Sequence, residues 1–335
     1  MNAPLALLLA LIVSLPATAG AAAPAHQLYA AVAMTKAQKN SSTPTDSGLY
    51  TRAPDGQWTH FGPRALGVTS IVVQPGSVGR VILIGCSDGV VRSADGGKTW
   101  RKTTGWEVAD VRALAFDGQN SSDAYAATCW GPLRSTDGGA TWALAQTGLP
   151  KLYCQTLVTD PRQPGRVLLG TEDGIYLSTD AAKTWSRTAS PAACILRLAR
   201  SAADPQVLVA ATLARGAWLS CDNGDSWSAT DSASAAANLY AAAIDPANGA
   251  HLALGGWAVG VRISADGGKT WTDRSAGLPV KNIFVLSFDP DVHGRLWAST
   301  FEEGTFFSDD LGATWHDGGL YGAYGFDLTF LPVTR

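Results

Sequence analysis

The sequence predicts an all-β fold: a seven-bladed β-propeller with four antiparallel strands per blade, whose first blade is closed by the C-terminal strand. Three observations support this prediction. A short phrase ending in tryptophan recurs seven times, the copies are evenly spaced, and each interval holds four short β-rich runs. A period of this size marks repeated supersecondary units, and four strands per repeat is typical of one propeller blade.

The repeated phrase is clearest as SADGGKTW, which occurs unchanged at residues 93–100 and 264–271. A catalytic motif would need only one copy, so recurrence predicts a structural role. Related phrases stand at 135–142, 178–185, 220–227 and 308–315, and a diverged copy stands at 51–58. The terminal residues are Trp58, Trp100, Trp142, Trp185, Trp227, Trp271 and Trp315, with successive spacings of 42, 42, 43, 42, 44 and 44.

Each interval has the same order of strands, as the third repeat illustrates. Its predicted strands are residues 111–116, 124–129, 132–135 and 142–146, with the phrase as a tight turn between the last two. The first repeat has no opening strand, because residues 28–33 already read as a second strand. Residues 325–332 follow the last repeat where an opening strand is due. We therefore expect the C-terminal strand to complete the first blade, which removes an exposed sheet edge.

Each position of the phrase has a physical role in the turn. The aspartate at the third position accepts hydrogen bonds from backbone N–H groups of its own turn, and glycine at the fifth tolerates positive φ. The tryptophan buries a large ring where the fourth strand begins. The diverged copy has Ala53 where aspartate is expected, which predicts a looser turn. The predicted structural aspartates are Asp95, Asp137, Asp180, Asp222, Asp266 and Asp310.

The pattern S-x-D-x-G-x-T-W resembles the Asp-box, or bacterial neuraminidase repeat, family across residues 28–331. Sialidases, xyloglucanases, sortilin-type receptors and photosystem II stability or assembly-factor-like propellers all resemble it. The resemblance implies a propeller and leaves the function open. Sialidases of this family have six blades and an arginine triad, and xyloglucanases build their cleft between two propellers; a single seven-bladed unit fits neither.

Composition and charge narrow the functional classes. The 335-residue chain has a formal net charge of -3, so it lacks the basic footprint that nucleic-acid binding needs. An apolar run from Leu5 to Leu15 precedes Ala17-Thr18-Ala19, which fits a signal-peptidase site. We predict a signal peptide over residues 1–21, one propeller domain over 22–335 and a periplasmic or secreted monomer. No later segment resembles a transmembrane span, and no cofactor is expected.

The five cysteines leave two alternatives open in an exported protein. They are either partly paired, with Cys154 and Cys194 as the candidate disulfide on neighbouring inner strands, or buried and reduced. A metal site is not predicted, because no histidine joins the cysteines and no C-x-x-C motif occurs.

Strand order also predicts a binding face. If the repeated turns lie on one face, the loops inside blades between the second and third strands and the loops between blades lie on the other, the top face. Aromatic side chains beside charges suit a protein or sugar ligand, although the same rings could plug the central funnel. The predicted binding residues are Arg64, Trp106, Trp130, Tyr153, Arg187, Tyr240, Trp257, Phe301 and Tyr321, and residues 36–47 form a long polar loop there.

Two functions follow from this face. The first is an exported, non-catalytic binding or assembly scaffold for a protein or an extracellular glycan. The alternative is a glycoside hydrolase of the xyloglucanase or sialidase type, which would need two carboxylates facing each other across a cleft. The top-face candidates for that chemistry are Glu107, Asp173 and Glu302.

Overall fold

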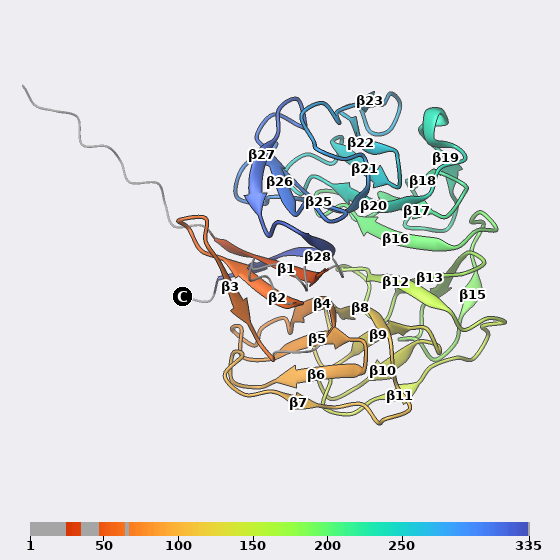
Figure 1. Ribbon diagram of the computed structural model, residues 1–335. Helices are drawn as coiled ribbons and strands as arrows, with labels where there is room; N and C mark the ends of the chain where they lie inside the picture. Colours follow the sequence, from red (N-terminus) through yellow and green to blue (C-terminus); the bar gives the residue numbers. More distant parts are fainter. Residues whose placement is uncertain (1–24, 35–46, 64–66, 334–335) are drawn as a thin grey trace, which may run out of the picture.

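The computed structural model describes residues 25–34, 47–63 and 67–333. The predicted signal peptide, most of the loop over residues 36–47 and Arg64 lie outside these residues. Seven four-stranded antiparallel sheets stand around a common centre, which confirms the predicted propeller (Figure 1). No helix among the described residues is long and apolar enough to cross a membrane.

The seven blades follow one another along the chain, with the strand nearest the centre named first. Blade 1 is β28 (Ala323–Pro332), β1 (His26–Met34), β2 (Gly48–Arg52) and β3 (Trp58–Phe61). Blade 2 is β4 (Val68–Val73), β5 (Ile82–Cys86), β6 (Gly89–Ser93) and β7 (Arg101–Lys102), and blade 3 is β8 (Val111–Phe116), β9 (Ala124–Thr128), β10 (Leu133–Ser135) and β11 (Ala143–Leu144). Blade 4 is β12 (Cys154–Thr159), β13 (Val167–Thr171), β14 (Ile175–Ser178) and β15 (Ser186–Arg187), and blade 5 is β16 (Ile195–Arg200), β17 (Leu208–Thr212), β18 (Ala217–Ser220) and β19 (Ser228–Ala229), followed by the 3-10 turn η1 (Ser232–Ser234). Blade 6 is β20 (Leu239–Ile244), β21 (Leu252–Gly256), β22 (Gly260–Ser264) and β23 (Thr272–Asp273), and blade 7 is β24 (Ile283–Phe288), β25 (Leu296–Thr300), β26 (Thr305–Ser308) and β27 (His316–Gly319).

The C-terminal strand closes the ring as predicted. β28 lies beside β1 in Figure 1, and the two strands pair antiparallel from His26 opposite Pro332 to Met34 opposite Ala323. The first blade thus joins the two ends of the propeller. Since an unpaired inner edge would expose a row of backbone N–H and C=O groups, this pairing is what completes the fold.

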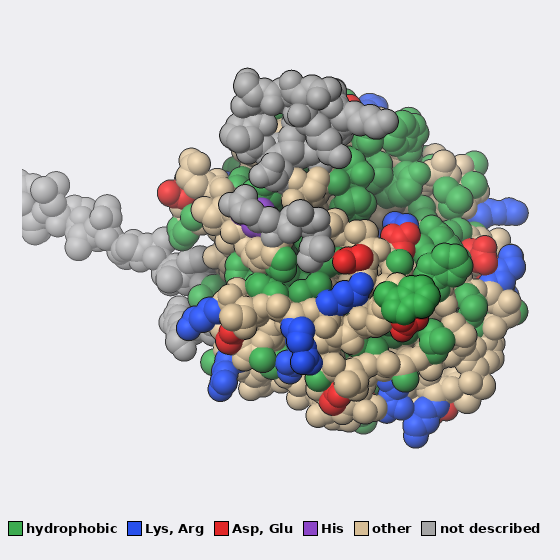
Figure 2. Space-filling model, turned by 60° about the horizontal axis from the view of Figure 1, so that its bottom comes forward, with side chains coloured by type: hydrophobic (Ala, Val, Ile, Leu, Met, Phe, Trp, Pro, Cys, Tyr) green, Lys and Arg blue, Asp and Glu red, His purple; other side chains and the backbone are tan. Residues whose placement is uncertain are grey.

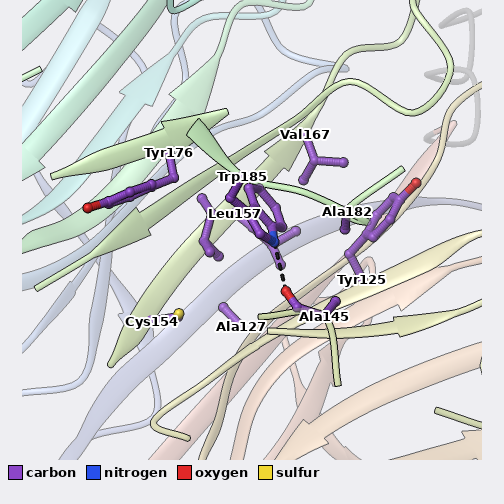
Figure 3. Packing of buried hydrophobic residues seen from close by; sticks show 10 residues of the cluster. Tyr125, Ala127, Ala145, Cys154, Leu157, Val167, Tyr176, Ala182 and Trp185 are labelled. Atoms are coloured by element: carbon purple, nitrogen blue, oxygen red, sulfur yellow. Dashed lines mark hydrogen bonds between the residues drawn. The ribbon is translucent and has the colours of Figure 1, made fainter. Parts of the chain in front are cut away.

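The core lies between neighbouring blades. Figure 3 shows one such layer, where Tyr125 of blade 3 and Leu157 and Trp185 of blade 4 pack together. An equivalent layer joins blade 7 to blade 1, with Trp297 buried against Leu28. In blades 2 to 7 the second strand is wholly buried, which explains why its sequence is mainly apolar.

The six intact repeat turns share one hydrogen-bond pattern. In the first, the Asp95 carboxylate accepts bonds from the backbone N–H groups of Lys98 and Thr99 and from the Thr99 hydroxyl, at 2.6–3.1 Å. The buried Ser93 hydroxyl donates to the same carboxylate at 2.8 Å and accepts from the N–H of Gly97. Each of the other five aspartates also accepts bonds from the backbone N–H and the hydroxyl of the residue four positions on: Asp137, Asp180, Asp222, Asp266 and Asp310. We call these turns the box turns.

The diverged turn of blade 1 is held differently. Ala53 occupies the aspartate position, and backbone bonds join it to Gln57 and Gly56. Asp55 accepts one bond, from the N–H of Gln57 at 3.0 Å. A single bond replaces the set that each box-turn aspartate receives.

The repeat tryptophans connect blades as well as filling space. The indole N–H of Trp185 donates to the carbonyl of Ala145 in the preceding blade at 2.7 Å, as the dashed line in Figure 3 marks. Trp315 donates to Arg274 of blade 6 in the same way, and Trp142 and Trp271 reach the hydroxyls of Thr103 and Thr230. A buried indole N–H needs an acceptor, so each of these bonds also fixes the angle between two blades.

Candidate functional site

The structure separates the two faces as the strand order predicts. In blades 2 to 7 the first residue of the loop inside the blade bonds to the residue that precedes the inner strand, for example the N–H of Trp257 to the carbonyl of Asn238. The loops inside blades and the loops between blades therefore adjoin on the top face. The box turns bond instead to the loop between the first and second strands, as the N–H of Gly96 does to Arg80, and lie at the opposite ends of the strands.

Exposed apolar side chains concentrate on the top face. Nine large hydrophobic residues are exposed among the described residues, and six of them stand on its loops. The strongest cases are Trp106 at 92% exposure and Trp130 at 65%. Figure 2 shows one face of the molecule, where green hydrophobic side chains gather between charged ones. The six are Trp106, Trp130, Leu152, Leu213, Trp257 and Tyr321, of which sequence reasoning missed the two leucines.

In blades 3, 4, 5 and 7 a threonine at the end of the second strand holds the loop inside the blade. The Thr128 hydroxyl donates to the carbonyl of Gly131 at 2.6 Å, which fixes the loop that carries Trp130. Thr171 and Thr300 make the same bond below the loops that carry Asp173 and Phe301. Binding residues on such loops are positioned by the rigid blade beneath them.

A β-bulge occurs at the top of every inner strand. In β8, for example, Val111 pairs with Thr128 and Ala113 with Ala127, so Arg112 has no partner in the ladder. A bulge re-aims the extra residue, and here all seven bulged side chains line one cavity of about 220 Å³ on the propeller axis. We call it the central cavity. The seven residues are Thr69, Arg112, Gln155, Leu196, Tyr240, Phe284 and Phe326.

One side of the central cavity is polar. Arg112 donates through Nη2 to Oδ2 of Asp110 at 3.1 Å and through Nε to the Cys129 sulfur at 3.4 Å. Arg197, which also lines the cavity, donates through Nη2 to the buried Asp327 carboxylate at 2.9 Å. Burial raises the pKa of the Cys129 thiol, against the opposite effect of Arg112, so this sulfur is held as a thiol.

The other side is aromatic. Tyr240 stacks on Phe284 with ring centroids 5.1 Å apart, and Phe284 stacks on Phe301 at 5.7 Å. Tyr324 stacks on Phe301 and meets Phe326 edge-on. Trp257 also meets Phe301 edge-on, at 5.4 Å. The sequence left open whether these aromatic rings bind a ligand or plug the central funnel. In the structure the inner rings pack on one another, while Trp257 remains 45% exposed. Phe284 and Phe326 were missed, because only the bulge turns these strand residues toward the axis.

The remaining predicted binding residues have local partners. Arg187 donates to the backbone carbonyls of Asp173, Ser190 and Pro191, which ties it to the loops of its own blade. Tyr153 is half-buried beside Cys129, and burial raises the pKa of its phenol.

The three candidate catalytic carboxylates lie on loops of different blades. Glu107 precedes β8, Asp173 joins β13 to β14, and Glu302 joins β25 to β26. Asp173 accepts bonds from the Thr171 hydroxyl at 2.8 Å and from the Tyr176 hydroxyl at 3.4 Å, so it is bound within its own turn. The residues that line the central cavity include no carboxylate in the described part of the chain.

The candidate disulfide is absent: all five cysteines are free. Cys154 begins β12 and packs between blades 3 and 4, beside Ala127 in Figure 3. Cys194 precedes β16, and its carbonyl accepts from Leu213 just as that of Tyr153 accepts from Glu172. The two cysteines are therefore one residue out of register, which directs their side chains to opposite faces of the sheet. Within the described ranges no group of three His, Cys, Asp or Glu side chains is placed to hold a metal ion.

Comparisons with known proteins agree on the fold. The Sortilin-Vps10 family model (sortilin, neurotensin receptor 3) matches residues 132–256, which is less than half of the chain. No curated protein matches the sequence.

Three solved structures illustrate the likeness. A GH74 enzyme from Niastella koreensis superposes with a TM-score of 0.67 at 19% identity, over 80% of this chain and 50% of its own. YCF48 bound to a D1 peptide gives 0.54 at 19% identity, over 74% and 84%. Sqt1 of Chaetomium thermophilum, bound to the N-terminus of ribosomal protein L10, gives 0.56 at 15% identity, over 79% and 78%. The chain spans about half the length of the first enzyme, and at these identities the likeness establishes the propeller fold alone.

Proposed function

We propose that this protein is an exported, non-catalytic scaffold that binds a polypeptide partner across its top face. The observation that carries the proposal is the set of six exposed apolar side chains on one face, three of them tryptophans. Exposed large hydrophobic residues that cluster are the usual mark of an interaction site, and tryptophan and tyrosine dominate binding energy at protein interfaces.

Two further observations support a polypeptide partner. Among propellers of similar fold, YCF48 binds a D1 peptide and Sqt1 binds the N-terminus of a ribosomal protein. The central cavity offers arginine and aromatic side chains without a carboxylate, an arrangement suited to recognition and poorly suited to acid–base hydrolysis. Export rests on the apolar run and small residues at the start of the sequence.

The proposal is tested by capture from the native extract. The immobilised domain, residues 22–335, is compared with the double variant Trp106→Ala/Trp257→Ala and with the control Leu144→Ala. Leu144 is 65% exposed but lies on the outer strand β11, away from the top face. We expect one protein to be retained by the wild type and the control and lost from the double variant, and to bind again after purification. Equal retention by all three proteins would contradict a top-face site.

Export is tested separately by cell fractionation and intact mass. We expect the protein in the periplasm or the medium, with a mass that lacks the predicted signal peptide. A full-length cytoplasmic protein would remove the exported part of the proposal and leave the binding face untouched.

A further inference from the structure

The two arginines of the central cavity have N–H groups to spare. Arg112 uses Nε and Nη2, and Arg197 uses Nη2. Within the described residues no hydrogen bond occupies Nη1 of Arg112, or Nε and Nη1 of Arg197. Both side chains are about 30% exposed, and both line the cavity. These guanidinium groups can therefore donate to a ligand that enters from the top face, and carboxylates are their strongest partners.

The facing wall of the central cavity accepts an apolar group. Tyr240, Phe284 and Phe326 contribute ring surface from blades 6, 7 and 1, while the arginines come from blades 3 and 5. The described lining residues include no aspartate or glutamate, and each of the two carboxylates beside the arginines, Asp110 and Asp327, binds through a single Nη2 and leaves other N–H groups of its arginine open. One cavity thus combines a flat apolar wall with unused cationic donors.

The size of the cavity limits what can enter. At about 220 Å³ it exceeds the roughly 150 Å³ of an engineered cavity that holds benzene. One aromatic ring and one carboxylate fit this volume, whereas a longer segment must remain on the face above.

The exposed residues around the central cavity indicate how a bound polypeptide segment runs across the top face. Exposed apolar residues stand on both sides of the axis: Trp106, Trp130 and Leu152 on loops of blades 2 to 4, and Leu213, Trp257 and Tyr321 on loops of blades 5 to 7. A polypeptide segment that contacts both groups by the shortest path crosses the cavity and continues beyond it. The group inserted into the cavity then comes from the middle of the segment, not from a chain end.

We propose that the central cavity is the specificity pocket of the top face and takes an aromatic side chain with a neighbouring acidic side chain from an internal segment of the partner. The ring packs on Tyr240, Phe284 and Phe326, and the carboxylate binds the free N–H groups of Arg112 and Arg197. This inference rests on the proposed function, since the partner that crosses the face supplies the inserted residues.

The first test uses small probes on the wild-type protein. Binding of 3-phenylpropionate is compared with that of 3-phenylpropionamide, its neutral match, by titration followed by NMR. We expect the acid to bind at least roughly tenfold more tightly, because it alone offers charge-assisted hydrogen bonds to the arginines. Equal affinity of the acid and the amide would overturn the proposed carboxylate preference of the pocket. This comparison uses the wild-type protein alone and does not depend on the folding of a variant.

The second test identifies the residue that binds the acid and asks whether an internal peptide segment can supply the acidic group. Arg112→Gln should weaken binding of the acid about tenfold, while Arg215→Gln, an exposed top-loop arginine outside the cavity, should leave it unchanged. The end-blocked peptide Ac-Gly-Phe-Asp-Gly-NH2 should bind, and its Asn counterpart should not. Binding of the acid with no binding of the Asp peptide would overturn the internal-segment source. If the probes fail while Trp106→Ala/Trp257→Ala still loses its partner, the pocket is wrong and the binding face stands.

Discussion

The indole N–H of Trp58 donates to the carbonyl oxygen of Gly318 at 2.7 Å, across 260 positions of sequence. This bond joins the outer strand of blade 1 (β3) to the outer strand of blade 7 (β27), and Trp58 also meets Trp297 edge-on at 6.4 Å. The repeat tryptophan of the first blade therefore helps to close the ring, in addition to the pairing of β1 with β28.

Replacing Trp58 by phenylalanine should lower the free energy of unfolding by about 1–3 kcal/mol, because the buried Gly318 carbonyl loses its donor. Trp100→Phe is the matched control. The Trp100 indole bonds within its own turn, to a half-buried carbonyl of Gly97 that water can reach. Urea unfolding measures both variants, and a control that loses as much stability as Trp58→Phe would contradict a specific role in ring closure.

Deleting residues 320–335 should remove the whole of β28 and leave the inner edge of β1 unpaired. We expect a sharp fall in melting temperature or aggregation during expression, since an open sheet edge both loses its ladder and recruits other chains. Leu328→Ala tests the same strand more gently. Its side chain is 2% exposed, and its truncation should cost about 2–5 kcal/mol. An unchanged melting temperature after the deletion would reject closure by this strand.

Acid should destabilise the protein, because it protonates the aspartates of the box turns. Bonds from the Thr184 hydroxyl and backbone lower the pKa of Asp180 from 3.8 to about 2, and equivalent bonds lower those of Asp95, Asp266 and Asp310 to about 2. A folded-state pKa below the unfolded value means that the stabilisation is complete above about pH 4. It is lost as pH falls toward 2, because the unfolded chain binds protons first. Unfolding followed by circular dichroism from pH 6 to pH 2 should show this fall.

Single-site variants connect that acid response to the turns. Asp180→Ala should cost about 1 kcal/mol at pH 7 and less at pH 2, by analogy with loss of a side-chain cap. Asp55→Ala is the matched control, because Asp55 accepts one backbone bond in the diverged turn and should matter less. An Asp180 variant that loses the same stability at both pH values would contradict a role through the ionised carboxylate.

The repeat made the fold predictable, and the bulges limited what could be predicted of the site. Trp58 to Trp315 mark seven equivalent positions, so their spacing determined blade number and strand order. The same logic placed Trp106, Trp130 and Trp257 on top-face loops, where the structure has them exposed.

Residues within strands were harder to assign from sequence. Phe284 and Arg112 stand inside apolar strand patterns, and the alternation of a regular strand would not aim them at the axis together. The ladder shows a bulge at each inner strand, which depends on pairing with the second strand and has no marker in a single sequence. The predicted common register of Cys154 and Cys194 was wrong for a related reason. A shift of one residue is hard to detect along the chain, yet it moves the side chain to the opposite face of the sheet.

Thiol reactivity tests the corrected cysteine assignment. Burial raises the pKa of Cys86 and Cys154 to about 12 and that of Cys194 to about 11, so almost no thiolate is present at pH 8. Cys221 is exposed on a box turn. Reaction with a disulfide reagent at pH 8 should show one fast thiol, lost in Cys221→Ser, and five thiols after unfolding without reductant. Three or fewer thiols in the unfolded protein would show that a disulfide forms.

The candidate carboxylates provide the last prediction, which separates a scaffold from a glycoside hydrolase. Hydrolysis needs two carboxyl groups about 5–5.5 Å apart for a retaining enzyme, or about 6.5–9.5 Å apart for an inverting one. Asp173 is bound within its own turn, and Glu107 and Glu302 stand on loops of different blades.

The triple variant Glu107→Gln/Asp173→Asn/Glu302→Gln should therefore bind the captured partner as the wild type does. Neither protein should release reducing sugar from a panel of β-glucans and sialylated glycans. The amide replacements keep side-chain size, so loss of activity could not be ascribed to altered shape. Sugar release by the wild type that the triple variant abolishes would establish the hydrolase and overturn the non-catalytic proposal. Release that survives the variant would assign the chemistry to other residues of the face.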